Sequence, residues 1–209
     1  MSHELFGYAD SAITINLDAI IANWRYVDSL SEPTTKTAAM VKANGYGLGS
    51  STVATALANA GCELFFVASL NEATELRDVF YQTGHGDLPI MVLHGIQHGQ
   101  EPDFTAHQLV PVLNDLEQIS RWQLYALKID TTLPALLHFD TGMTRLGLDA
   151  IQADWLVQNQ QTLDGLDINY LMSHLVSAEL LDDPVSVHQL AKFNELRGWF
   201  PSIPASLAN

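Results

Sequence analysis

Cysteine is nearly missing from this chain of 209 residues, which contains Cys62 alone. One cysteine cannot close an internal disulfide, and it cannot supply the paired thiolates of a cysteine-rich zinc site. The sequence therefore predicts a protein of the reducing cytoplasm that needs neither a structural disulfide nor a metal.

Basic residues and long apolar stretches are also scarce. Lysine and arginine together number 9 against 24 aspartates and glutamates, so the formal net charge is -15. Such a charge repels nucleic acid and anionic membrane surfaces. The N-terminus has no basic segment followed by an apolar one, and no apolar run is long enough to cross a bilayer. We expect a soluble protein with no nucleic-acid or membrane partner.

What the chain does have is a regular alternation of patterns. Hydrophobic residues make up 47% of it, enough for one sizeable core in a single domain. Short apolar runs predict strands at Thr37–Val41, Leu64–Ala68, Pro89–Leu93, Leu109–Leu113, Ala135–Phe139 and Ile168–Leu175. The intervals carry helical patterns at Ser50–Ala60, Leu70–Tyr81, Asp115–Lys128, Asp149–Asn159 and Val185–Phe200.

This alternation indicates an α/β barrel or a doubly wound sheet, because parallel strands roughly 20 to 30 residues apart leave room for a crossover helix. An extra strand is expected at Ile13–Leu17, followed by a helix from Ala19 to Leu30 that Asp18 caps. After six βα units, Pro201–Ala208 predicts a seventh strand without its helix. A (β/α)8 barrel would then remain open, so we expect a truncated barrel.

Polar residues follow several of the predicted strands at the ends where barrels place their active sites. Lys42 and a glycine-rich segment follow the first strand, Asp140–Arg145 follow the fifth, and His174 lies in the sixth. A lysine between a buried strand and a tight turn suits covalent chemistry on a carbonyl group. Taken alone, such a lysine is more often an ordinary solvated loop residue.

Four segments together carry a specific resemblance. VKANGYGLG at Val41–Gly49 and FDTGMTRLGL at Phe139–Leu148 are similar to segments of the alanine racemase family, and so are SHLVSAE from Ser173 and PASLAN from Pro204. The four occur in the family's order and span nearly the whole chain. The resemblance implies that residues 1–209 are the N-terminal pyridoxal-phosphate-binding barrel domain of such an enzyme.

The resemblance also implies a role for particular residues. Lys42 would hold pyridoxal 5'-phosphate as a Schiff base and move the α-proton of the substrate on one face. Arg145 would hydrogen-bond the phenolic oxygen of the cofactor and position the substrate carboxylate. The remaining implied cofactor contacts are the phosphate ligands Tyr46 and Ser206, the apolar contact Leu93, and His174 in the polar network beneath the pyridine ring.

Two positions depart from the family pattern. Leu48 stands where the attachment motif commonly has histidine, which leaves the role of Lys42 intact. His138 stands where many members have a carboxylated lysine that steadies the arginine of this segment. We therefore expect no lysine carboxylation here, and Arg145 must be oriented in another way.

The implied reaction is the interconversion of L-alanine and D-alanine, which supplies D-alanine for peptidoglycan. In the family, the second acid/base group is a tyrosine from a C-terminal domain of the partner subunit, so a homodimer is expected. None of the 6 tyrosines of this chain has a context like that tyrosine. We therefore expect the isolated chain to racemise alanine poorly or not at all.

Three other interpretations remain. The chain is also compatible with a stand-alone barrel that binds and carries pyridoxal phosphate, and its length favours that interpretation. A racemase of serine or another small amino acid is a second alternative, which the sequence does not exclude. The third is an α/β domain without chemistry, which would require four polar clusters to fall at strand ends by accident.

Overall fold

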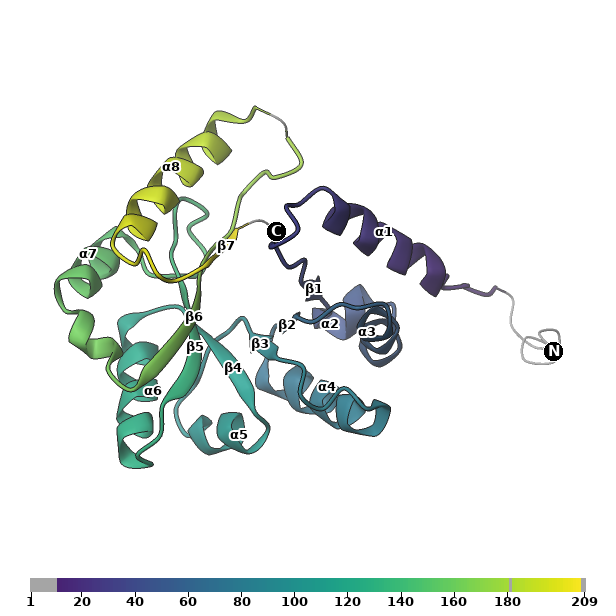
Figure 1. Ribbon diagram of the computed structural model, residues 1–209, viewed down its shortest axis with the longest axis horizontal. Helices are drawn as coiled ribbons and strands as arrows, with labels where there is room; N and C mark the ends of the chain where they lie inside the picture. Colours follow the sequence, from purple (N-terminus) through teal and green to yellow (C-terminus); the bar gives the residue numbers. More distant parts are fainter. Residues whose placement is uncertain (1–10, 181, 208–209) are drawn as a thin grey trace.

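Seven parallel strands form one curved sheet whose spatial order is the order of the chain. The computed structural model describes residues 11–180 and 182–207. Sequential order excludes the doubly wound alternative, which reverses strand order, and gives an open part of a (β/α)8 barrel (Figure 1). The strands are β1 Ala39–Met40, β2 Phe65–Val67, β3 Ile90–Val92, β4 Leu109–Leu113, β5 Leu133–His138, β6 Leu166–Ser173 and β7 Ala205–Leu207.

Helices follow the strands along the chain and lie around the outside of the sheet (Figure 1). The five helices predicted between strands are confirmed, with no end shifted by more than two residues. They are α3 Ser50–Asn59, α4 Leu70–Thr83, α6 Leu116–Lys128, α7 Ala150–Gln158 and α8 Pro184–Gly198. Short elements that the sequence did not indicate are α2 Lys42–Tyr46, α5 Glu101–Ala106 and the 3-10 turn η1 Gln160–Leu163. No helix in the described ranges is long and apolar enough to cross a membrane.

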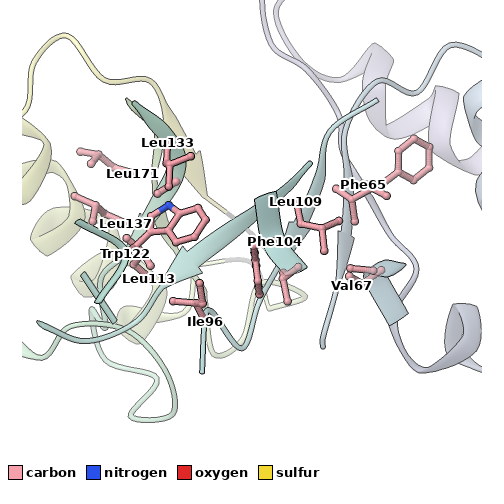
Figure 2. Packing of buried hydrophobic residues seen from close by; sticks show 14 of the residues in the cluster. Phe65, Val67, Ile96, Phe104, Leu109, Leu113, Trp122, Leu133, Leu137 and Leu171 are labelled. Carbon is pink, nitrogen blue, oxygen red and sulfur yellow. The ribbon is translucent and has the colours of Figure 1, made fainter. Parts of the chain in front are cut away.

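The side chains of the strands point alternately to the two faces of the sheet and form two apolar layers. The larger cluster lies between the sheet and its helices, and includes Phe65, Leu109 and Trp122 (Figure 2). The smaller cluster comprises Phe66, Met91, Val110, Val112, Leu136 and Met172. Because successive residues of a strand point to opposite faces, this second set covers the concave face. Both faces are thus apolar, as parallel barrel strands require.

The N-terminal prediction was partly wrong. Helix α1 Leu17–Ser29 is capped by Asn16, whose side-chain oxygen accepts the Ala19 amide at 3.1 Å, so Asp18 lies inside the first turn. The carboxylate of Asp18 is still favourable there because it faces the positive end of the helix dipole. Residues 11–16 form no strand, and the side chain of Ile13 is 89% exposed. No described segment pairs with them, and an extended segment without a partner lacks the ladder that defines a strand.

An arginine links the loops at the amino-terminal ends of two neighbouring strands. Arg77 of α4 is only 1% exposed. Its guanidinium donates hydrogen bonds of 2.5 to 2.9 Å to main-chain oxygens in the loops that precede β3 and β4. Burial lowers the pKa of Arg77, because the charged form loses its water. Four carbonyl partners compensate this loss, and they are Gly86, Leu88, His107 and Gln108.

Candidate active site

A cavity of about 600 Å³ lies at the carboxyl-terminal ends of the strands. Its size falls within the usual range for small-molecule and cofactor pockets. Segments at the ends of β1, β2, β3, β5 and β6 contribute to its wall, which is therefore a joint product of the sheet. The lining residues are Met40, Lys42, Tyr46, Ala68, Leu93, His94, His138, Arg145, Leu146, Met172 and His174.

The charge of this cavity opposes that of the whole molecule. The chain carries a formal charge of -15, yet no acidic side chain occurs among the described residues that line the cavity. Arg145 supplies permanent positive charge, Lys42 adds a primary amine, and His94, His138 and His174 add three imidazoles. Such a wall is suited to an anionic ligand that carries phosphate or carboxylate groups.

Lys42 is followed by a turn of left-handed helix. The φ angles of Ala43, Asn44, Gly45 and Tyr46 lie between 50° and 63°. Left-handed conformation costs a residue other than glycine roughly 1–2 kcal/mol. The turn folds Tyr46 back toward the lysine, so that Lys42 Nζ lies 5.9 Å from the centre of the Tyr46 ring. Strained backbone of this kind is typical of functional sites.

Local hydrogen bonds stabilise this turn. The Gly45 amide donates to the Val41 carbonyl at 2.9 Å, and the Asn44 side-chain oxygen accepts the Ser50 amide at 3.0 Å. Gly45 is buried, and a Cβ atom there would lie 3.2 Å from the Ser50 nitrogen. A side chain at this position would be crowded as well as strained, so glycine is favoured.

Arg145 lies in a loop whose two ends are joined. Phe139 and Leu148 form an isolated parallel bridge, and Asp140 Oδ1 accepts the amides of Gly142 and Thr144 at 2.9 and 3.0 Å. The loop is fixed, but its arginine is exposed and has no hydrogen bond or ion pair with any described residue. Its guanidinium donors are available to a ligand.

His138 is held in one tautomer. Asn114 Nδ2 donates to the carbonyls of Leu93 and Val112, at 2.9 and 2.8 Å, which fixes the orientation of its amide. Asn114 Oδ1 therefore faces His138 Nδ1 at 2.8 Å and can only accept. The proton is on Nδ1, which leaves Nε2 as an acceptor in the neutral ring.

Burial keeps this ring neutral. His138 is 5% exposed, and its pKa is lowered to about 4, chiefly by burial. His174 and Arg145 contribute to this lowering, and the carboxylate of Asp140 partly opposes it. At the position where the resemblance implied a carboxylated lysine, this chain thus has an uncharged group.

His174 directly follows β6, where its main-chain oxygen accepts a hydrogen bond from Gln189 Nε2 at 2.9 Å. Gln189 belongs to α8 and is fully buried. It also contacts Thr141 Oγ1 at 3.4 Å, so the ends of β5 and β6 share one support from the outer helix layer.

The structure brings together five of the six residues singled out by sequence, namely Lys42, Tyr46, Leu93, Arg145 and His174. Ser206 does not line this cavity, but it pairs in register with Met172, which does. Sequence reasoning missed His94 as a lining residue, although it directly follows the predicted strand Pro89–Leu93 and the rule of polar residues at strand ends would have found it. The cofactor roles of all six stay predictions.

The cavity fits pyridoxal phosphate on the chemistry of its groups. A primary amine can bond an aldehyde, the guanidinium of Arg145 can bind anionic oxygens, and the apolar residues Met40, Leu93 and Met172 can contact a flat ring. No three His, Cys, Asp or Glu side chains gather as a metal site in the part of the chain that the structure describes.

Comparison with known proteins gives a consistent result. The family described as alanine racemase, N-terminal domain, matches residues 15–209. The alanine racemase of Brucella abortus is 42% identical over 201 residues, which cover 96% of this chain and 50% of that protein. The alanine racemase of Rickettsia typhi is 38% identical and is covered to 48%. The chain thus spans about half the length of these curated relatives.

Solved structures agree. The alanine racemase of Bartonella henselae with covalently bound pyridoxal phosphate superposes with a TM-score of 0.86 at 35% identity, over 93% of this chain and 55% of that one. A histidine racemase from Leuconostoc mesenteroides shares the fold, with a TM-score of 0.79 at 23% identity, over 92% of this chain and 51% of that one. On the family match and these relatives together, the chain belongs to the alanine racemase family, whose N-terminal domain it represents.

Proposed function

We propose that this chain provides the pyridoxal-phosphate-binding domain of an enzyme that interconverts L-alanine and D-alanine. The observation that carries the proposal is the single cavity in which Lys42 and Arg145 face a ligand space lined by no described acidic residue. The identity to curated alanine racemases supports it, and so does the Bartonella henselae enzyme, which holds pyridoxal phosphate covalently.

When bound, the cofactor supplies an electron sink that makes the α-proton of an amino acid acidic. The residues of this chain hold and orient the reactants. Lys42 Nζ would hold the cofactor and would take or return the α-proton of the substrate on one face. Arg145 binds a carboxylate or phenolate oxygen with its planar donors, and His138 remains neutral beside it.

Racemisation also needs an acid/base group on the opposite face, and we place that group on a partner subunit. The working enzyme would then be a cytoplasmic homodimer that supplies D-alanine for peptidoglycan. We propose that the present 209 residues bind the cofactor as one domain and, tested alone, racemise alanine weakly or not at all. Turnover of L-alanine by the purified chain at a rate typical of enzymes would contradict this.

The decisive experiment is titration of the purified chain with pyridoxal phosphate, followed by borohydride reduction. We expect a visible absorption band that reduction fixes as a covalent adduct on Lys42, located by peptide mass spectrometry. Lys42→Ala should form no adduct, whereas Lys36→Ala, which removes an exposed lysine paired with Glu63, should behave as the wild type. Equal labelling of several lysines would mean that no specific site exists.

A second substrate deserves testing because the histidine racemase of Leuconostoc mesenteroides shares this fold. The fold therefore does not determine the side chain that the site accepts. Proton–deuterium exchange at the α-carbon, measured for alanine, serine and histidine with the cofactor-loaded protein, separates the candidates. Preference for alanine supports the proposal, and preference for another amino acid reassigns the substrate.

A further inference from the structure

Glu72 makes its short hydrogen bonds outside the helix that contains it. It occupies the third position of α4, where a capping box with Ser69 is formed. The two bonds of that box are long, at 3.4 and 3.5 Å. By contrast, Glu72 Oε1 accepts the Ala43 amide at 2.8 Å and Oε2 accepts the Ala68 amide at 2.7 Å. The carboxylate is directed to the strand ends more than to its own helix.

These two amides belong to neighbouring βα units. Ala68 follows β2, and Ala43 follows Lys42 in the left-handed turn after β1. The Ala43 N–H is part of the same peptide plane as the Lys42 carbonyl, so holding this N–H fixes the ψ angle of Lys42. On the other side, the Val41 amide donates to the Phe66 carbonyl at 2.9 Å. The lysine is thus fixed by a hydrogen bond before it and another after it.

The hydrogen bond that follows the lysine comes from Glu72, which uses its two carboxylate oxygens to accept two different amides. An amide in place of the carboxylate has one acceptor oxygen and one NH2 group, and the NH2 would face an N–H donor. A glutamine could therefore satisfy Ala43 or Ala68 but not both. An aspartate is one methylene shorter and cannot span the same two amides without movement of α4. The arrangement requires glutamate in both charge and length.

We propose that Glu72 is a positioning residue for Lys42, holding the left-handed turn so that the lysine amine is presented to the cavity. The inference deepens the proposed function, on which it rests, because it assigns a role toward the same reactive amine. Glu72 lies outside the residues that line the cavity, so it acts through Lys42 and touches no ligand itself.

The test compares Glu72→Gln with Ser69→Ala, both in the full 209-residue chain. Each variant weakens the cap of α4, but only Glu72 contacts the Lys42 turn. We expect Glu72→Gln to speed hydrogen exchange of the Ala43 amide by roughly 10-fold or more, and to slow formation of the pyridoxal phosphate adduct by a similar factor. Ser69→Ala should lower the melting temperature while leaving both rates within about twofold of the wild type.

Amides of β4 serve as the folding control, since unchanged exchange there shows that Glu72→Gln is folded. If Glu72→Gln matched Ser69→Ala in exchange and in adduct formation, Glu72 would be only a helix cap and the inference would be overturned. If the wild type formed no adduct, the proposed function would fail. The exchange comparison at Ala43 would still decide separately whether Glu72 holds the turn.

Discussion

Two arginines lie at opposite ends of the strands of the same sheet, and their surroundings are opposite. Arg77 at the amino-terminal edge is buried and donates to four carbonyl oxygens. Arg145 at the carboxyl-terminal edge is exposed and has no hydrogen bond or ion pair among the described residues. A satisfied guanidinium links structural segments, whereas one with free donors can bind a ligand. Residue type alone does not distinguish these roles, but the count of satisfied donors does.

The largest effect on stability is expected at the satisfied arginine. Arg77→Ala removes the donors of four buried carbonyl groups, and we expect it to lower the free energy of unfolding by about 3–5 kcal/mol. Urea denaturation measures this loss. Arg77→Lys retains the charge but not the planar guanidinium, so its free energy of unfolding should lie between those of the wild type and Arg77→Ala. A loss below about 1 kcal/mol for alanine would mean that water replaces the guanidinium.

His138 is a buried titratable side chain at the carboxyl-terminal ends of the strands, as Arg77 is at the amino-terminal ends. It provides a second prediction, for stability as a function of pH. Its pKa is lowered to about 4 in the folded chain, from an ordinary value of 6.5. Between these values the unfolded chain binds a proton that the folded chain does not, so stability falls as pH decreases. Below pH 4 the loss of stability that His138 causes reaches on the order of 3 kcal/mol.

The pH dependence of unfolding, compared between wild type and His138→Gln, isolates this contribution. The variant should lose less stability than the wild type between pH 6.5 and about 4. Parallel curves would show that His138 remains accessible to protons in the folded chain.

A smaller effect is expected from the loop that presents Arg145. Gly147 has a φ of 109°, and a Cβ atom there would lie 2.7 Å from the Asp140 nitrogen. Gly61 has a φ of 107° with nothing within 4 Å of such an atom. Both alanine variants suffer the same backbone strain, so Gly147→Ala should be the less stable by about 1–3 kcal/mol, the cost of overpacking. Equal melting temperatures would contradict the steric argument.

The smallest effect on stability is expected at the free arginine. Arg145→Ala should change the free energy of unfolding by less than about 0.5 kcal/mol, as for ordinary surface substitutions. It should nevertheless weaken binding of pyridoxal phosphate roughly 10-fold or more, because a charged hydrogen bond is lost. A stability loss comparable with that of Arg77→Ala would remove the distinction between the two arginines.

The sequence predicted the repeating fold well because the periodic signal is strong. All six strand predictions between Thr37 and Leu175 are confirmed, and β7 lies within the predicted Pro201–Ala208. Alternation alone left two topologies open, since it says nothing of which strands become neighbours. The cap at Asn16 was missed because both it and Asp18 are good capping residues, and only the observed hydrogen bond distinguishes them.

The site residues that lie in sequence motifs could be predicted, whereas contacts between residues of neighbouring βα units could not. Lys42 and Arg145 lie in recognisable segments. The glycine-rich segment after Lys42 predicted a tight turn, but not its left-handed helical form, because Ala43 and Tyr46 do not favour that conformation. The pairing of Asn114 with His138 and of Glu72 with Ala43 joins residues 24 and 29 positions apart. Such contacts depend on how neighbouring units pack, which no local pattern encodes.

The sequential strand order has a consequence for biosynthesis. Each strand finds its partner in the next unit of the chain, so hardly any pairing waits for a distant segment. Native contacts of short sequence separation favour rapid folding, and domains form from the N-terminus as the chain emerges from the ribosome. The turn at Lys42 and its support from Glu72 belong to the first two units. The residues that shape the turn at Lys42 are therefore all synthesised before the later strands.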